Sequence, residues 1–94
     1  MNISSALIKQ CVTVGDFETW SYLRKEYLPN EYHLIYEAID NHCEKFHQFP
    51  SFDDLKLSIR HPATKDKVYA LESVEVDIEP ATLLEYLKNE YAQK

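Results

Sequence analysis

The sequence predicts an all-α fold, a compact bundle of five to six short helices built by a single domain over residues 1–94. Its apolar residues recur at spacings of three and four, which is the period of an amphipathic helix. The 94 residues include one Gly, whereas β-hairpins usually need glycine at their turns. The chain is 45% hydrophobic and 13% aromatic, a composition that favours a packed core over disorder.

Two helices are predicted before the first proline. The first covers residues 3–13, and Gly15 is a suitable residue to end it. Asp16 is a suitable N-cap for the second helix, which is expected to continue to Pro29. The residues expected to face inward are Ile3, Leu7 and Cys11 in the first helix and Phe17, Trp20, Leu23 and Tyr27 in the second.

The strongest amphipathic pattern lies between Asn30 and His47. Charged and amide side chains occupy one side of this segment, and Asn30 is the expected N-cap. Pro50 prevents the helix from continuing. The apolar stripe predicted to face the core consists of Tyr32, Ile35, Tyr36, Ile39, Cys43 and Phe46.

Three more helices and a connector are predicted after Pro50. Residues 51–54 resemble a capping box and open a helix that stops by residues 61–62. Residues 64–73 predict another short helix, and residues 74–78 alternate like a strand without a partner, which indicates an extended connector. Pro80 suits the first turn of a last helix. The apolar positions of these helices are Phe52, Leu55, Ile59, Val68, Leu71, Leu84, Leu87 and Tyr91.

The formal net charge of −6 restricts the kind of partner. Nucleic acids and anionic membranes attract proteins largely through Lys and Arg, so strong direct binding to either is not expected. The first ten residues do not resemble a signal peptide and no stretch reaches transmembrane length, which indicates a cytoplasmic protein. Cys11 and Cys43 lie among apolar residues, so we expect two reduced, buried thiols.

No residue pattern predicts a metal or cofactor site. The single Gly excludes a glycine-rich phosphate loop. Cys43 and His47 are four residues apart and could face one metal ion, with further ligands from distant residues such as His61 or Cys11. Two ligands make an incomplete metal site. We therefore prefer to interpret Cys43 and His47 as ordinary core and surface residues.

Catalysis by paired carboxylates is the less favoured alternative. Asp53 with Asp54, or Glu37 with Asp40, would supply such an acid–base pair. All four fall on predicted solvent faces or caps, where carboxylates are common, and nothing indicates a desolvated pocket that would shift their pKa values. A small metal-dependent or acid–base enzyme therefore ranks below an interaction domain.

The candidate contact residues are three tyrosines and two cations. Tyr22, Tyr69 and Tyr86 lie off the inward stripes, and exposed tyrosine is typical of protein interfaces. Lys56 and Arg60 belong to the one basic cluster, for which a solvated helix face is the preferred interpretation because few cations in an acidic domain give little phosphate affinity. The members of this cluster are Lys56, Arg60, His61, Lys65 and Lys67.

Four segments carry a resemblance to a known family. They are Glu26–Leu28, Leu34–Ile39, Phe46–Ser51 and Leu55–Ile59. Together they resemble the N-terminal domain of DnaB-type replicative helicases, where an aromatic pair precedes a striped helix, a turn with Pro and another helix. The segment DNHCEKFHQFPSFDDLKLSI is most similar to the corresponding segment in helicases of T-even-like phages. The segment LLEYLKNEYAQK lies where that family enters its helical hairpin.

The resemblance implies a globular head from the collar of a hexameric, ATP-driven helicase at a replication fork. In that family the N-terminal region supports ring assembly, so the expected partners are primase, a helicase loader or neighbouring helicase subunits, for a phage protein in a bacterial host. The sequence lacks the phosphate loop and arginine finger of the motor, so the chain is not expected to be an enzyme by itself. The alternative is a stand-alone small phage protein that acts as an adaptor or inhibitor on the replication machinery.

Overall fold

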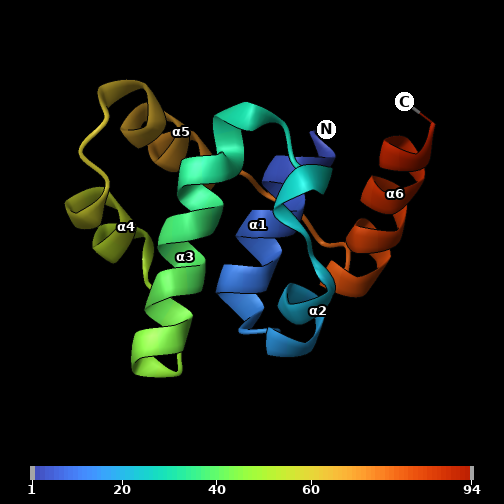
Figure 1. Cartoon of the computed structure of the whole chain (residues 1–94), viewed down its shortest axis with the longest axis horizontal. Coiled ribbons are helices and arrows are strands. Elements are labelled where there is room, and N and C mark those ends of the chain that lie inside the picture. Colours follow the sequence, from blue (N-terminus) through green and yellow to red (C-terminus); the bar gives the residue numbers. More distant parts are fainter. Residues whose placement is uncertain (1, 94) are drawn as a thin grey trace.

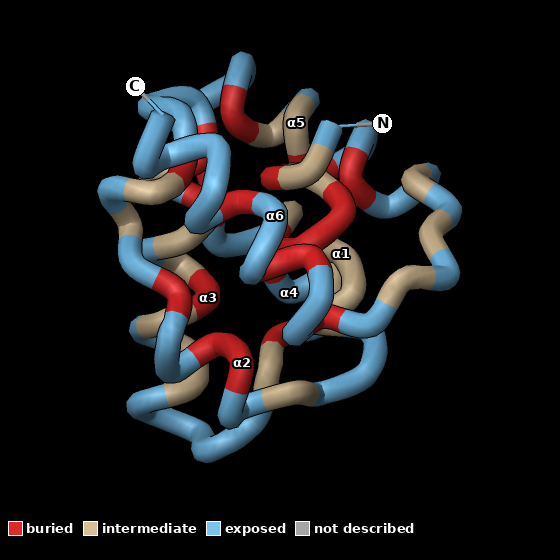
Figure 2. Tube along the Cα trace, turned by 90° about the vertical axis from the view of Figure 1, so that its right-hand side faces the viewer, coloured by how far each residue is buried: buried red, intermediate tan, exposed pale blue. Residues whose placement is uncertain are grey.

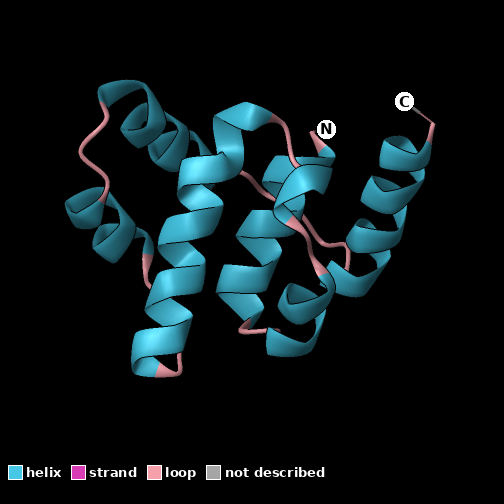
Figure 3. Ribbon diagram, in the orientation of Figure 1, coloured by secondary structure: helices cyan, strands magenta, loops and turns pink. Residues whose placement is uncertain are grey.

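Six α-helices and two short 3-10 turns, without a strand, form residues 2–93, the part of the chain that the computed structural model describes (Figures 1 and 3). The α-helices are α1 (Ile3–Val14), α2 (Phe17–Tyr22), α3 (His33–Phe46), α4 (Phe52–Ser58), α5 (Pro62–Glu72) and α6 (Pro80–Ala92), and the 3-10 turns are η1 (Lys25–Tyr27) and η2 (Asn30–Tyr32). The predicted all-α bundle of five to six short helices is confirmed.

Helix α1 lies at the centre of the bundle. It packs against α2, α5 and α6, and it stands between α3 and α6 in Figure 1. Ala6, Leu7, Ile8 and Cys11 on this helix are all fully buried. Figure 2 shows the buried positions on the inner sides of the helices and the exposed ones on the outside. The other buried hydrophobic residues are Trp20, Leu23, Leu28, Tyr32, Ile35, Ile39, Leu55, Ile59, Val68, Leu71, Leu83, Leu84 and Leu87.

Local capping signals determine several helix ends as predicted. Gly15 ends α1 with φ 77°, a left-handed conformation that glycine adopts without strain. Asp16 caps α2 by accepting a hydrogen bond from the Thr19 N–H at 3.0 Å. In the capping box of α4, Ser51 Oγ accepts from the Asp54 N–H and Asp54 Oδ2 accepts from the Ser51 N–H, both at 3.0 Å.

The segment between α5 and α6 is an extended connector, as predicted. Val74, Val76 and Ile78 are half-buried while the residues between them are exposed, which explains the strand-like alternation in the sequence. Gln10 Nε2 of α1 donates a hydrogen bond to the Ile78 carbonyl oxygen at 2.8 Å and so fixes the connector to the central helix. Pro80 is the first residue of α6, the position expected from the sequence.

The second predicted helix is shorter than expected. Helix α2 ends at Tyr22 instead of continuing to Pro29, because Leu23 adopts an extended conformation with φ −75° and ψ 133°. The turn η1 follows. This change of direction allows both Leu23 and Leu28 to be buried, with 3% of each residue exposed.

Two predicted helix starts are wrong. Asn30 does not cap α3, because η2 forms a tighter first turn and Tyr32 becomes the residue that precedes the helix. Helix α5 begins at Pro62 rather than Thr64, because proline fits the first turn, where no N–H is needed. The His61 ring caps this helix by accepting a hydrogen bond from the Thr64 N–H.

Three aromatic residues expected to face the core are largely exposed. The exposed fractions are 46% for Phe17, 53% for Phe46 and 40% for Tyr91. Phe17 begins α2, Phe46 ends α3 and Tyr91 lies next to the end of α6, so each is at or next to an end of its helix. Helical spacing predicts the face on which a residue lies, but not whether another element covers that point.

Candidate partner-binding surfaces

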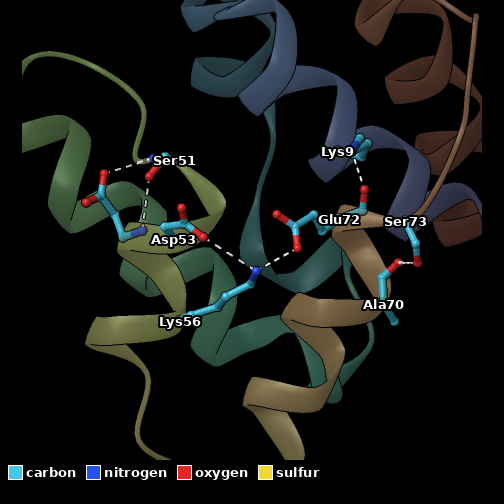
Figure 4. A network of polar contacts seen from close by, with 8 residues as sticks. Lys9, Ser51, Asp53, Lys56, Ala70, Glu72 and Ser73 are labelled. Carbon is cyan, nitrogen blue, oxygen red and sulfur yellow. Dashed lines mark hydrogen bonds and ion pairs between the residues drawn. The ribbon is translucent and has the colours of Figure 1, made fainter.

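Lys56 and Tyr69 lie together where α4 packs against α5. The Lys56 Nζ is 4.6 Å from the centroid of the Tyr69 ring, and it pairs with Glu72 at 2.6 Å and Asp53 at 3.5 Å. Figure 4 shows the Lys56 side chain reaching between these two carboxylates. The hydrogen bond to Glu72 is the main reason that the pKa of Lys56 is raised. Lys56 thus links α4 to α5, and its contact with a partner stays a prediction.

Lys9 extends the same network to the central helix. Its Nζ donates a hydrogen bond to the carbonyl oxygen of Glu72, the last residue of α5, at 2.7 Å (Figure 4). The same Nζ lies 4.8 Å from the centroid of the Phe52 ring at the start of α4. A cation near the C-terminal end of a helix is favourable. Three helices are therefore joined by two lysines.

The basic cluster seen in the sequence is divided in the structure. Lys67 pairs with Glu31 at 3.2 Å and lies over the Tyr32 ring, 5.2 Å from its centroid. Arg60 and Lys65 form no ion pair within residues 2–93. The cluster therefore carries less unpaired positive charge than its sequence suggests, which favours the interpretation as a solvated face.

Tyr22 lines a groove between α2 and α6, called the α2–α6 groove here, with a volume of about 330 Å³. Leu84 and Ala81 supply its apolar part, while Glu18 of α2 and Glu85 of α6 are its acidic residues. Lys88 Nζ lies 3.6 Å from Glu85. The lining residues are Glu18, Thr19, Tyr22, Ala81, Leu84, Glu85 and Lys88.

The three candidate tyrosines are exposed, as their positions off the stripes predicted. The exposed fractions are 64% for Tyr22, 53% for Tyr69 and 51% for Tyr86. Tyr86 lies on α6 outside the lining of the α2–α6 groove, and Tyr69 lies on α5 beside Lys56. Arg60 lies in the connector between α4 and α5. The structure therefore distributes these residues over several surfaces and brings only Lys56 and Tyr69 into contact.

An apolar surface at one end of the molecule was missed by the sequence analysis. It forms where α2 begins and α3 ends, which lie at the same end in Figure 1. Phe17 stacks on Phe49 with ring centroids 4.6 Å apart. A groove of about 300 Å³ beside them is lined by Phe17, Cys43, Glu44 and His47. The sequence feature that could have indicated this surface is the position of Phe17 and Phe46 at the ends of predicted helices.

A wider cleft of about 560 Å³ lies between the start of α1, η1 and the end of α6. Tyr27 and Tyr91 line it, and their ring centroids are 5.0 Å apart. Ile3 and Leu87 contribute apolar surface, and Glu90 contributes a carboxylate. The cleft explains why Tyr91 keeps one side exposed although it contacts another ring.

Cys43 and His47 do not belong to a larger set of metal ligands. Within residues 2–93, no group of three or more His, Cys, Asp or Glu side chains is arranged to hold a metal ion. His47 ends α3 in a left-handed conformation with φ 57°, and its N–H donates to the Cys43 carbonyl oxygen at 2.8 Å. The His42 ring packs against Phe46 at a centroid distance of 4.6 Å. These residues therefore have structural positions in the last turns of α3.

The four carboxylates considered as acid–base pairs are held by structural bonds. The partners are Lys56 for Asp53, the Ser51 N–H for Asp54, Lys25 for Glu37 and the Trp20 indole N–H for Asp40. The bonds from Ser51 lower the pKa of Asp54. A lowered pKa keeps this carboxyl ionised, as its capping role requires, and suits it poorly to act as a general acid near neutral pH.

The two cysteines are free thiols, but only one is fully buried. Cys11 is 0% exposed, whereas Cys43 is half-buried, which corrects the expectation that both are buried. Burial is the main reason that the pKa is raised from 9.0 to about 12 for Cys11 and to about 11 for Cys43.

We expect both thiols to react slowly with iodoacetamide at pH 8. The raised pKa of Cys43 reduces its thiolate fraction about a hundredfold, and the burial of Cys11 adds a barrier to access. Mass spectrometry of the native protein should show Cys43 modified before Cys11, while the unfolded protein in urea should react at both positions. Faster native modification of Cys11 would contradict the packing of α1.

No family model matches the chain, and neither a curated protein nor a solved structure matches it significantly. Among the helices of residues 2–93, none has the length and apolar character that a bilayer crossing requires.

Proposed function

We propose that this chain is the N-terminal interaction and assembly domain of a hexameric replicative DNA helicase, without catalytic activity of its own. The helicase assignment rests on the resemblance of residues 26–60 to that family. The segments that carry the resemblance fall in η1, in α3, in the turn after α3 and in α4. We also propose that it is a phage protein that acts inside a bacterial host.

The observation that carries the interaction role is the α2–α6 groove. An exposed tyrosine gives a large contact area with few rotatable bonds, and tyrosine is enriched at protein interfaces. Tyr22 is 64% exposed, and it lines the groove with the exposed Ala81 and with Leu84, a core residue that is only 5% exposed. Carboxylates from both helices border this apolar part and would select the charge of the partner. The proposed partners are primase, a helicase loader or a neighbouring helicase subunit.

Binding of the isolated chain to the primase and to the loader encoded by the same genome tests this function. Biolayer interferometry should detect at least one of them, and Tyr22→Ala should raise its dissociation constant about tenfold, since interface tyrosines often contribute about 1.4 kcal/mol or more. Leu57→Ala, at an apolar residue of α4 that is 82% exposed, is the control variant and should leave binding unchanged. Lack of binding to every replication protein would contradict the proposal, as would ATP hydrolysis by the isolated chain.

The reading frame beyond codon 94 distinguishes this proposal from its alternative. A frame that continues into a GxxxxGK[ST] motif would supply the missing motor and support the helicase assignment. A natural stop codon directly after Lys94 would instead favour the stand-alone adaptor or inhibitor.

A further inference from the structure

We propose that a groove along α3 binds an acidic amphipathic helix of a partner protein. This groove, called the α3 groove here, has a volume of about 360 Å³ and lies between α3 and the connector that joins α4 to α5. Leu34, Ala38 and Asn41 line it from α3, and Ile59 and Arg60 line it from the connector. The inference rests on the proposed interaction role, because it names the chemistry of a partner, but it does not depend on the helicase assignment.

On its α3 side, the groove is formed by a helix face on which Leu34 is not covered by another element. Leu34, Ala38 and Asn41 are spaced by four and three residues, so they lie on one face over about two turns. The adjacent face of α3 carries Ile35 and Ile39, which are fully buried in the core. Leu34 is 50% exposed and Ala38 is half-buried, whereas Ile59, at the floor of the same groove, is only 7% exposed. A surface of this length and spacing suits aliphatic side chains of a helix that lies along α3.

The charge of the groove selects an acidic occupant. Arg60 is exposed and forms no ion pair within residues 2–93. The carboxylate of Glu37, also at the groove, is paired with Lys25 at 3.0 Å. The Nδ1 of His61, the other basic residue there, lies 3.1 Å from Thr64 Oγ1. An unpaired guanidinium thus borders an apolar surface in a protein of net charge −6, and guanidinium groups bind carboxylates through two parallel hydrogen bonds.

A nucleic acid fits these observations less well than a protein helix. Phosphate would pair with Arg60, but a phosphate backbone offers no aliphatic group for Leu34 and Ala38. A helix that carries Leu and Glu on one face satisfies both parts of the groove.

The test uses a synthetic alanine-based helix of about 16 residues, with two Leu four residues apart and two Glu on the same face. Titration into the 15N-labelled protein should shift amide signals of Leu34, Ala38 and Arg60. Arg60→Glu should raise the dissociation constant at least about tenfold, because an attraction becomes a repulsion. Leu34→Ser should raise it by a similar factor.

Two matched variants control for charge and for apolarity. Arg24→Glu changes the net charge by the same amount at an exposed position directly before η1 and outside the groove lining, and should leave binding unchanged. Leu57→Ser removes another leucine, 82% exposed on α4 and outside the groove lining, and should also have no effect. Equal weakening by Arg24→Glu and Arg60→Glu would overturn the inference, since it would indicate general charge attraction.

Three further outcomes also overturn the inference. They are no shift of amide signals at millimolar peptide, shifts confined to another surface, or the same shifts on adding unlabelled protein, which would indicate a second copy as the occupant.

The two binding experiments together also separate this inference from the proposed function. Absent peptide binding with retained binding to primase or loader overturns the inference alone. Peptide binding in the α3 groove without binding to any replication protein overturns the proposed function alone.

Discussion

Replacement of Trp20 by alanine is expected to lower the free energy of unfolding by about 3–5 kcal/mol. Trp20 is 5% exposed, stacks on Tyr36 with ring centroids 5.0 Å apart, and meets Phe49 edge to face at 5.8 Å. Alanine would leave a cavity between α2 and α3. A domain of this size has a total stability of about 5–15 kcal/mol, so urea unfolding followed by circular dichroism should show a much lower midpoint.

Trp20→Phe separates ring packing from hydrogen bonding at the same position. It keeps an aromatic ring against Tyr36 but removes the indole N–H, which donates to Asp40 Oδ1 at 3.1 Å. We expect a smaller loss, about 1–3 kcal/mol. Asp40→Asn retains an acceptor and should cost less than about 1.5 kcal/mol. Equal losses for Trp20→Phe and Trp20→Ala would mean that the hydrogen bond, rather than the packed rings, holds α2 on α3.

The parts of the fold that could be predicted from sequence depend on local chemistry. Gly15 ends α1 and the Ser51–Asp54 capping box opens α4 because the relevant hydrogen bonds and dihedral angles involve residues within four positions of each other. The buried Ile35 and Ile39 followed from the helical period, which needs no knowledge of the neighbouring helices. Such signals predict which helices exist and which face is buried.

The errors arise where a residue far along the chain decides the outcome. Helix α2 ends at Tyr22 because burial of Leu23 and Leu28 in the core outweighs continued helical bonding. Phe46 has the spacing of a core residue, yet it is 53% exposed at the last position of α3. Where one helix begins or ends relative to its neighbours depends on tertiary packing. The spacing of apolar residues along the sequence carries no information about it.

The candidate surfaces were less predictable than the fold for the same reason. Exposure of Tyr22 could be predicted from its place off the apolar stripe, but the groove beside it also needs Leu84 of α6. Lys56 was expected at the surface, and its partner Glu72 lies sixteen residues away on α5. The α3 groove combines α3 with the connector after α4. A groove is made by pairs of elements, so its residues can be recognised only after the elements are packed.

Tyr32 connects the start of α3 to the central helix, and Tyr32→Ala is expected to cost about 3–5 kcal/mol. Tyr32 is 2% exposed, and its hydroxyl shares a hydrogen bond with Ser5 Oγ of α1. Lys67 of α5 lies over the same ring. Three helices therefore meet at this side chain, and its loss should lower the melting temperature by at least about 12 °C, since each kcal/mol corresponds to about 4–8 °C. Differential scanning calorimetry measures this shift.

The ring of Tyr32, rather than its hydroxyl, should provide most of this stability. Tyr32→Phe keeps the buried ring and removes one hydrogen bond, so we expect a loss of about 0.5–1.5 kcal/mol. Ser5→Ala leaves the hydroxyl of Tyr32, a residue that is 2% exposed, without its partner, so we expect a loss of about 1–3 kcal/mol. The double variant should be less destabilised than the sum of the two single variants, since both changes remove the same bond. A loss for Tyr32→Phe as large as that for Tyr32→Ala would contradict this division and would make the hydroxyl the main link between η2 and α1.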